Sequence, residues 1–515
     1  MSFTWQIDHA HETELRRLAE LLALALRPGD CVALHGDLGA GKTMLARALI
    51  SALLNDPEAE VPSPTFGLVQ TYETARFPVA HFDFYRLAGA EEARELGFEE
   101  AAGNGVAVVE WPERAAELLP ADRLDVRLTE GPDPLARGIV IEGHGHWRDR
   151  AARLAIVVSF LRMSGWWGGR IRYLQGDAST RRYARLEDSG RFSILMDARR
   201  QPDGPPIRGD RPYSRIAHLA EDVRPFVAVA EALRCAGIST PEIYAQDLEQ
   251  GLLLFEDLGE RLFARELETG TSPALLWGTA VEVLVRLRQT PVPAALPLAD
   301  GSLCSLPLYD REVLQIEAEL LLDWCWPALR SEPAPPSARA EFAGLWSGVF
   351  DQLLAVPPGW VLRDYHSPNL IWLAERKGLQ RVGVIDFQDA LQGHPAYDLV
   401  SLLQDARLDL PPELEARLFE YYCSAVSATE PAFDRAAFSF AYAALGAQRN
   451  TKILGIFTRL AVRDGKSHYL RHIPRIWRYL ERDLTHVALR PLQDWYNLHF
   501  PVGVRMRPLG AERAD

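Results

Sequence analysis

This 515-residue chain has few lysines, no CxxC cysteine pair and no long apolar run. Four of its 56 lysine and arginine residues are lysines, namely Lys42, Lys377, Lys452 and Lys466. None of the five cysteines forms a CxxC pair, which argues against a zinc site and a disulfide framework. No apolar run approaches the ~20 residues of a membrane span, and residues 1–25 lack a basic-then-apolar signal pattern. We therefore expect a cytoplasmic protein without a membrane partner.

The length and the charge distribution indicate several compact units. At ~100–200 residues per domain, a chain of 515 residues predicts about three units. Residues 1–150 hold 25 Asp and Glu against 14 Lys and Arg, so most of the net charge of −14 lies in this part. Binding to nucleic acid depends on neutralising phosphates. We therefore expect no direct nucleic-acid binding by the N-terminal domain alone.

A glycine-rich loop follows the first buried-strand pattern. The apolar run Cys31–His35 predicts a strand, Met44–Leu54 predicts a helix, and Gly-Asp-Leu-Gly-Ala-Gly-Lys-Thr stands between them. This order is typical of a Walker A site for ATP. Lys42 would reach the outer phosphates, and the hydroxyl of Thr43 would bind Mg²⁺. The backbone N–H groups of the turn would cradle phosphate, and its glycines are Gly36, Gly39 and Gly41.

A nucleotide site also needs a second carboxylate, which organises the metal and the attacking water. Asp83 stands near the end of the strand-like segment Val79–Phe84, and Glu110 follows the apolar run Val106–Val109. Either carboxylate would also suit a solvated strand end. The residues alone leave the choice open.

Four motifs in series resemble the TsaE family over about residues 5–145. They are the loop Gly36–Thr43, Ser63–Phe66, His81–Leu87 and Val109–Arg114. The resemblance implies an ATPase that assists formation of threonylcarbamoyladenosine at tRNA position 37, with TsaB- and TsaD-like proteins as partners. It implies that Thr43 and Glu110 form the Mg²⁺ pair. It also implies a catalytic or metal-organising role for Asp83 and places Thr65 near the γ-phosphate.

Glycine and proline turns follow this first module, between Gly131 and Gly169, and surround a helical pattern at Arg150–Met163. We predict four segments, at residues 1–148 (P-loop ATPase domain), 149–168 (linker), 169–258 (kinase-like N-lobe) and 259–515 (kinase-like C-lobe).

The second module begins with strand patterns at Ile171–Leu174, Tyr183–Leu186 and Phe192–Met196. The polar loop Gly176–Tyr183 between the first two would fold over nucleotide phosphates, with Ser179 and Arg182 as candidate contacts, although an ordinary hairpin is the alternative. Leu252–Phe255 predicts a strand that ends in a hinge, where Glu256 marks a candidate adenine-binding segment.

Two downstream segments supply the groups that phosphoryl transfer requires. Val361–Trp372 places Asp364 and Asn369 five residues apart, and a second strand pattern ends in Asp386. Transfer to a hydroxyl needs a carboxylate to accept the proton and oxygen ligands to hold Mg²⁺. We predict that Asp364 is the base and that Asn369 and Asp386 are the metal ligands.

These segments resemble the aminoglycoside phosphotransferase superfamily, whose members have a protein-kinase-like fold. Further motifs resemble the AmgK family, and they are Gly176–Tyr183, Leu195–Ala198, Tyr397–Arg407, Gln448–Phe457 and Arg463–Lys466. The resemblance covers roughly residues 170–500. It implies an ATP-dependent kinase for the anomeric hydroxyl of N-acetylmuramate and N-acetylglucosamine in cell-wall recycling.

The sequence departs from the superfamily at two points. Leu362 stands where a histidine commonly precedes the catalytic Asp, and the N-lobe has no lysine for the phosphates, with Met196-Asp197 in its place. The candidates to replace that charge are Arg181, Arg182 and Arg199.

A basic stretch near the C-terminus suggests how an acidic sugar would be held. Its members Arg449 and Lys452 are candidate contacts for the lactyl carboxylate of muramate, although a solvated helix face is the alternative.

The predicted fold is therefore an α/β P-loop NTPase domain followed by a bilobal α+β kinase-like domain, both of which use ATP and Mg²⁺. The predicted function is bifunctional. The alternative is an aminoglycoside or small-metabolite phosphotransferase with a regulatory P-loop module that is not engaged in tRNA modification.

Overall fold

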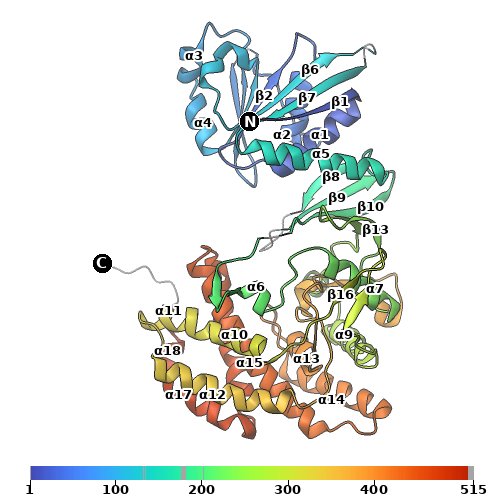
Figure 1. Ribbon diagram of the computed structural model, residues 1–515, viewed down its shortest axis with the longest axis vertical. Coiled ribbons are helices and arrows are strands. Elements are labelled where there is room, and N and C mark those ends of the chain that lie inside the picture. The colour runs from blue at the N-terminus through green and yellow to red at the C-terminus, as the bar shows by residue number, and fades with distance from the viewer. Residues whose placement is uncertain are drawn as a thin grey trace. The chain divides into compact units, whose positions relative to one another are not determined.

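The computed structural model describes residues 2–65, 67–131, 133, 135–174, 181–200 and 202–507. The chain divides into two compact units (Figure 1). The first comprises Met1–Arg199 and Ile243–Asp257, and the second comprises Arg200–Glu242 and Leu258–Asp515.

The first unit contains a mixed seven-stranded sheet in the order β1-β7-β6-β2-β5-β4-β3. The strands are β1 (Phe3–His11), β2 (Cys31–His35), β3 (Val69–Glu73), β4 (Pro78–Asp83), β5 (Val106–Glu110), β6 (Leu124–Glu130) and β7 (Ala136–Gly143). The central strand β2 runs parallel to β5 and β6, and β4 runs parallel to β5. The carboxyl ends of these parallel strands therefore meet at one edge, where α/β proteins place their ligands.

Helices cover both faces of this sheet. They are α1 (Glu12–Ala25), α2 (Lys42–Leu54), α3 (Ala90–Glu95), α4 (Phe98–Asn104) and α5 (Trp147–Met163). Successive side chains of a strand point to opposite faces. Val32 of β2 accordingly packs in the core with α1, α2 and α5, whereas its neighbour Cys31 packs in the core with α3 and α4. The predicted strand Cys31–His35 and the helix that follows it are confirmed.

The first unit also contains an antiparallel five-stranded sheet in the order β13-β14-β10-β9-β8. Its strands are β8 (Arg170–Leu174), β9 (Arg182–Asp188), β10 (Arg191–Asp197), β13 (Ile243–Asp247) and β14 (Leu252–Glu256). The three strands expected at the start of the kinase-like module, and the later strand at Leu252–Phe255, are confirmed.

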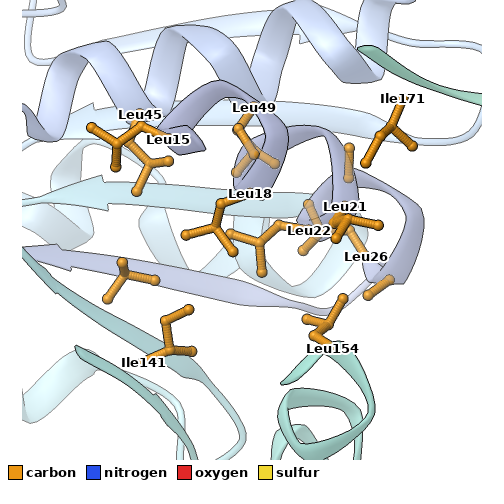
Figure 2. Packing of buried hydrophobic residues seen from close by; sticks show 14 of the residues in the cluster. Leu15, Leu18, Leu21, Leu22, Leu26, Leu45, Leu49, Ile141, Leu154 and Ile171 are labelled. Atoms are coloured by element: carbon orange, nitrogen blue, oxygen red, sulfur yellow. The ribbon is translucent and has the colours of Figure 1, made fainter. Parts of the chain in front are cut away.

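The segment expected as a linker, residues 149–168, lies largely within helix α5. Its residues Leu154 and Val158 belong to one hydrophobic core that runs from the seven-stranded sheet to the five-stranded sheet. Figure 2 shows leucines of α1 and α2 in this core together with Leu154 of α5 and Ile171 of β8. The two sheets are thus joined by packed side chains as well as by the chain.

The second unit is mainly helical. Its helices are α6 (Tyr213–Ile216), α7 (Arg224–Cys235), α8 (Phe263–Glu268), α9 (Pro273–Arg288), α10 (Arg311–Leu320), α11 (Trp326–Arg330), α12 (Pro336–Leu353), α13 (Ala396–Leu403), α14 (Pro412–Thr429), α15 (Arg435–Val462), α16 (Ile473–Asp483), α17 (Arg490–His499) and α18 (Val502–Arg505). Short two-stranded pairings join β11 (Pro206–Arg208) to β12 (Arg211–Pro212), β15 (Ala295–Pro297) to β16 (Leu303–Ser305), β17 (Gly359–Val361) to β20 (Leu391–Gly393), and β18 (Leu370–Trp372) to β19 (Val382–Val384). Among the helices of the described residues, none is long and apolar enough to cross a membrane.

Candidate active sites

The glycine-rich loop between β2 and α2 has positive φ at all three of its glycines, a backbone that glycine adopts without strain, and φ is 83° at Gly39. Gly36 has φ 139°, and a Cβ there would lie 2.5 Å from the carbonyl oxygen of Leu128. Gly41 has φ 105° and directly precedes the first turn of α2. The loop can therefore turn tightly and end at the N-terminus of a helix, where free N–H groups favour phosphate.

Lys42 folds back over this loop. Its Nζ donates hydrogen bonds to the carbonyl oxygens of Gly36 at 2.7 Å and Asp37 at 2.8 Å. It also lies 3.7 Å from the ring centroid of Trp111. Burial lowers the pKa of Lys42, while Glu110 and other nearby carboxylates oppose that shift. A bound phosphate would offer the ammonium a charged acceptor in place of two neutral carbonyls.

Thr43, Glu110 and His81 form a chain of contacts at the end of β5. Thr43 Oγ1 donates to Glu110 Oε2 at 2.7 Å, and His81 Nε2 lies 2.9 Å from Glu110 Oε1. Glu110 is 2% exposed and His81 is fully buried. A buried carboxylate requires such partners. His81 had no predicted role, although it lies two residues before Asp83 and therefore on the same side of β4.

Asp83 lies opposite Glu110 in the parallel register of β4 and β5. Thr65 Oγ1 donates to Asp83 Oδ2 at 3.1 Å, and the backbone N–H of Tyr85 donates to Oδ1 at 3.0 Å. The structure therefore brings Thr65, Asp83 and Glu110 to the strand end beside the glycine-rich loop.

In the second unit, Asp364, Asn369 and Asp386 lie together. Asn369 Nδ2 donates to the backbone carbonyl of Asp364 at 3.0 Å and to Asp386 Oδ2 at 3.3 Å. Gln388 Nε2 donates to Asp386 Oδ1 at 2.9 Å. Asp386 has φ 61°, a left-handed backbone that aspartate tolerates better than most residues do. This backbone turns the chain just after the β18–β19 hairpin, and the carboxylate of Asp386 lies beside Asn369.

A buried aspartate holds the segment before Asp364. Asp398 of α13 accepts hydrogen bonds from the backbone N–H groups of Leu362 at 2.6 Å and Arg363 at 2.9 Å. Burial raises the pKa of Asp398 to about 7, although the two backbone hydrogen bonds favour the ionised form. Hydrogen bonds to Asp398 of α13 therefore fix the backbone directly before the predicted base. These bonds come from backbone N–H groups and do not depend on the side chain at position 362.

Two family models match this chain in sequence. The model described as "Threonylcarbamoyl adenosine biosynthesis protein TsaE" matches residues 9–138, and that of the "Phosphotransferase enzyme family" matches residues 170–438. The N-acetylmuramate/N-acetylglucosamine kinase of Caulobacter vibrioides is 40% identical over 362 residues, which are 68% of this chain and 98% of that protein. The tRNA threonylcarbamoyladenosine biosynthesis protein TsaE of Rickettsia felis is 45% identical over 118 residues, 23% of this chain and 68% of that protein. The chain belongs to both families.

A third relative has the same name as the first. The N-acetylmuramate/N-acetylglucosamine kinase of Pseudomonas aeruginosa is 36% identical over 323 residues, which are 61% of this chain and 83% of that protein. The expected fusion, with a P-loop domain before a phosphotransferase domain, is thereby confirmed, and so is the expected fold class. ATP is the nucleotide that both families imply.

The nucleotide contacts predicted for the N-lobe of the phosphotransferase domain stay predictions. Ser179 lies outside the described residues. Arg182 begins β9, where it pairs with Asp197 of β10, and Glu256 ends β14. Asp197, one of the two residues expected in place of the missing lysine, accepts hydrogen bonds from Arg153 Nη2 at 2.7 Å and Nε at 3.1 Å. Arg153 belongs to α5, in the segment expected as a linker, and had no predicted role.

The structure gives the two predicted sugar contacts other partners. Lys452 Nζ lies 2.8 Å from the buried Glu317 of α10, which also accepts from Arg363. Burial alone would raise the pKa of Glu317, but Lys452 and Arg363 lower it to about 2. Arg449 is buried and donates to the backbone carbonyl of Gln404 at 3.3 Å. Neither residue lies on the solvated helix face that was the alternative, and their role toward the sugar stays a prediction.

Proposed function

We propose that the phosphotransferase domain transfers the γ-phosphate of ATP to the anomeric hydroxyl of N-acetylmuramate or N-acetylglucosamine. We also propose that the TsaE-family domain hydrolyses ATP in support of threonylcarbamoyladenosine formation in tRNA. The observation that supports both is that each family-matched segment brings together two side chains that carry oxygen atoms. Thr43 and Glu110 form one, and Asn369 and Asp386 form the other.

Both clusters suit Mg²⁺, which prefers hydroxyl, carboxylate and amide oxygens. Thr43 and Glu110 would hold the ion in the TsaE-family domain, and Asn369 and Asp386 would hold it in the phosphotransferase domain. A bound ion would neutralise charge on the triphosphate. In the first site Lys42 would bind the outer phosphates, and Asp83 with Thr65 would orient the attacking water.

In the phosphotransferase domain, Asp364 accepts the proton of the sugar hydroxyl. The hydroxyl oxygen forms a bond to the γ-phosphorus, and the bond from that phosphorus to the β–γ bridging oxygen breaks, which leaves ADP. Ser179, Arg182 and Glu256 are proposed to bind the nucleotide in the N-lobe. Arg449 and Lys452 are proposed to act on the sugar side, in the case of Lys452 through its pairing with Glu317.

The proposed partners of the N-terminal domain are TsaB- and TsaD-like proteins. Residues 1–150 hold 25 acidic against 14 basic residues. This excess of acid favours a complex in which another subunit binds the tRNA. We place both reactions in the cytoplasm, where ATP and tRNA are available.

A phosphorylation assay tests the sugar-kinase proposal and separates it from the alternative. The full chain is incubated with labelled ATP and, in turn, with N-acetylmuramate, N-acetylglucosamine, kanamycin and choline. We expect transfer to the two amino sugars only. Asp364→Asn should lower transfer by roughly 10²–10⁴-fold, the range for losing a general base, while nucleotide binding is kept. Transfer to kanamycin or choline but not to the sugars would contradict the proposal, as would full activity of the variant.

A further inference from the structure

A cavity of about 370 Å³ lies between α1, α2 and β8 of the first unit, and neither Thr43 nor Glu110 is part of its lining. Its volume falls near the lower end of small-molecule pockets, which span ~300–1,000 Å³. Its charged lining residues are Glu12, Arg16, Glu20, Arg47, Arg170 and Arg172. The wall thus combines the P-loop helix α2 with the first strand of the kinase N-lobe.

The acidic residues of this cavity are already neutralised. Arg16 Nη2 lies 2.7 Å from Glu12 Oε1. Arg17 Nη1 lies 2.5 Å from Glu20 Oε2, and the same oxygen accepts the backbone N–H of Ile171 at 2.7 Å. Neither carboxylate is therefore available to balance the remaining cations.

In the described part of the chain, three arginines of the lining form no ion pair with a carboxylate, and they are Arg47, Arg170 and Arg172. Arg47 is exposed, and its Nε donates to the backbone carbonyl of Val61 at 2.8 Å. Like charges gathered around one cavity repel one another, and an anion bound among them would remove that repulsion.

The backbone around these arginines is firmly held. Ile171 is 4% exposed and belongs to the core shared with α1, α2 and α5 (Figure 2). Its N–H bond to Glu20 fixes β8 against α1. Arg170 and Arg172 are its two chain neighbours and leave β8 on the side opposite to Ile171. Their positions relative to α2 are therefore set by the fold.

The C-terminal end of α2 also borders the cavity, and free carbonyls at a helix end disfavour an anion. Two of these carbonyls are occupied: that of Ala52 accepts from the N–H of Asn55 at 3.2 Å, and that of Ser51 accepts from the N–H of Asp56 at 3.1 Å. Capping thus reduces the opposing charge, and the side chains of Ser51 and Asn55 add neutral hydrogen-bond donors to the wall.

We propose that this cavity binds a compact anion with at least two phosphate or carboxylate charges, held by Arg47, Arg170 and Arg172. Guanidinium groups bind phosphate and carboxylate through paired hydrogen bonds, which suits such a ligand better than a neutral one. The ligand contacts the helix that carries Lys42 and Thr43 and the first strand of the kinase sheet.

The test is calorimetric titration of the full chain while a non-hydrolysable ATP analogue saturates both nucleotide sites. One arm uses inorganic pyrophosphate and the other uses N-acetylmuramate 1-phosphate, so that a free phosphate compound and a sugar phosphate are distinguished. We expect one site per chain for at least one probe. Arg170→Ala with Arg172→Ala should weaken its binding at least ten-fold, because two charged contacts are lost.

Two further variants keep this test decisive. Arg172→Glu changes a single exposed side chain and should abolish binding without loss of fold. Arg417→Ala removes an exposed arginine of α14 in the second unit and should leave binding unchanged. Equal affinity in all variants, no saturable binding of either probe, or arginine-dependent binding of tRNA alone would overturn the proposal. Because the readout is binding, its failure would leave the sugar-kinase assay unaffected.

Discussion

At the scale of single residues, both sites depend on buried partners that stand far away in the sequence. Thr43 and Glu110 are separated by 67 positions, yet Thr43 Oγ1 lies 2.7 Å from Glu110 Oε2. The parallel pairing of β2 with β5 places the ends of these strands side by side, and the P-loop helix begins next to them. The resemblance to the TsaE family implied that Thr43 and Glu110 form a pair and that Asp83 lies near them. It did not reveal His81, whose partner Glu110 is known only once the strands are paired.

His81 offers a prediction at this scale. His81→Ala should raise the Mg²⁺ concentration for half-maximal ATP hydrolysis by about 10–100-fold, because residues that orient a metal ligand typically contribute that much to metal affinity. Titration of Mg²⁺ in the ATPase assay, with partner proteins present, measures this. His81→Gln retains a donor toward Glu110 and should recover part of the loss. An unchanged Mg²⁺ requirement in His81→Ala would show that Glu110 needs no support from His81.

At the scale of elements, helix α5 shows what a local pattern reveals and what it leaves open. Glycine and proline turns on both sides indicated a linker at residues 149–168, and the helical pattern predicted at Arg150–Met163 agrees with α5. Strand β1 was missed, yet Phe3, Trp5 and Ile7 alternate with exposed residues as in a half-buried strand. In both cases the sequence pattern of the element was present. The residues that each element packs against, on β7 for β1 and in the shared core for α5, could not be deduced from neighbouring positions in the sequence.

The ion pair between α5 and β10 gives a prediction for these elements. The side chains of Arg153 and Asp197 are 7% and 19% exposed. Removing one partner of a buried pair leaves an uncompensated charge and typically costs about 3–5 kcal/mol. Arg153→Met should therefore lower the free energy of unfolding of the first unit by about 3 kcal/mol, as followed by denaturant titration. Adding Asp197→Asn should restore much of this loss, whereas an additive double variant would show that the two residues do not interact.

At the scale of the whole molecule, the structure associates the kinase N-lobe sheet with the P-loop domain in one compact unit. A fragment that ends at residue 145 would lack α5, whose buried residues include Trp147, Leu154 and Leu161. Burial of one large apolar side chain contributes ~1.5–3 kcal/mol. We therefore predict that the fragment 1–145 unfolds at least 10 °C below the fragment 1–199 in thermal denaturation. Equal melting temperatures would show that α5 does not stabilise the P-loop domain.

The resemblances to two families predicted the order of the two domains in this chain, since the segments that match the two families follow one another without overlap. The nucleotide contacts of the N-lobe and the sugar contacts were harder to predict. A charge such as Lys452 can face a substrate or a buried carboxylate, and the sequence does not distinguish the two. In the structure Glu317 is that carboxylate, 135 positions before it.

A crossed pair of variants tests whether one chain carries two separate ATP-using sites. Lys42→Ala and Asp364→Asn are each assayed for partner-stimulated ATP hydrolysis and for transfer of labelled phosphate to N-acetylmuramate. We predict that Lys42→Ala abolishes the first activity and retains the second, and that Asp364→Asn does the reverse. Loss of sugar phosphorylation in Lys42→Ala, or loss of both activities in either variant, would contradict it.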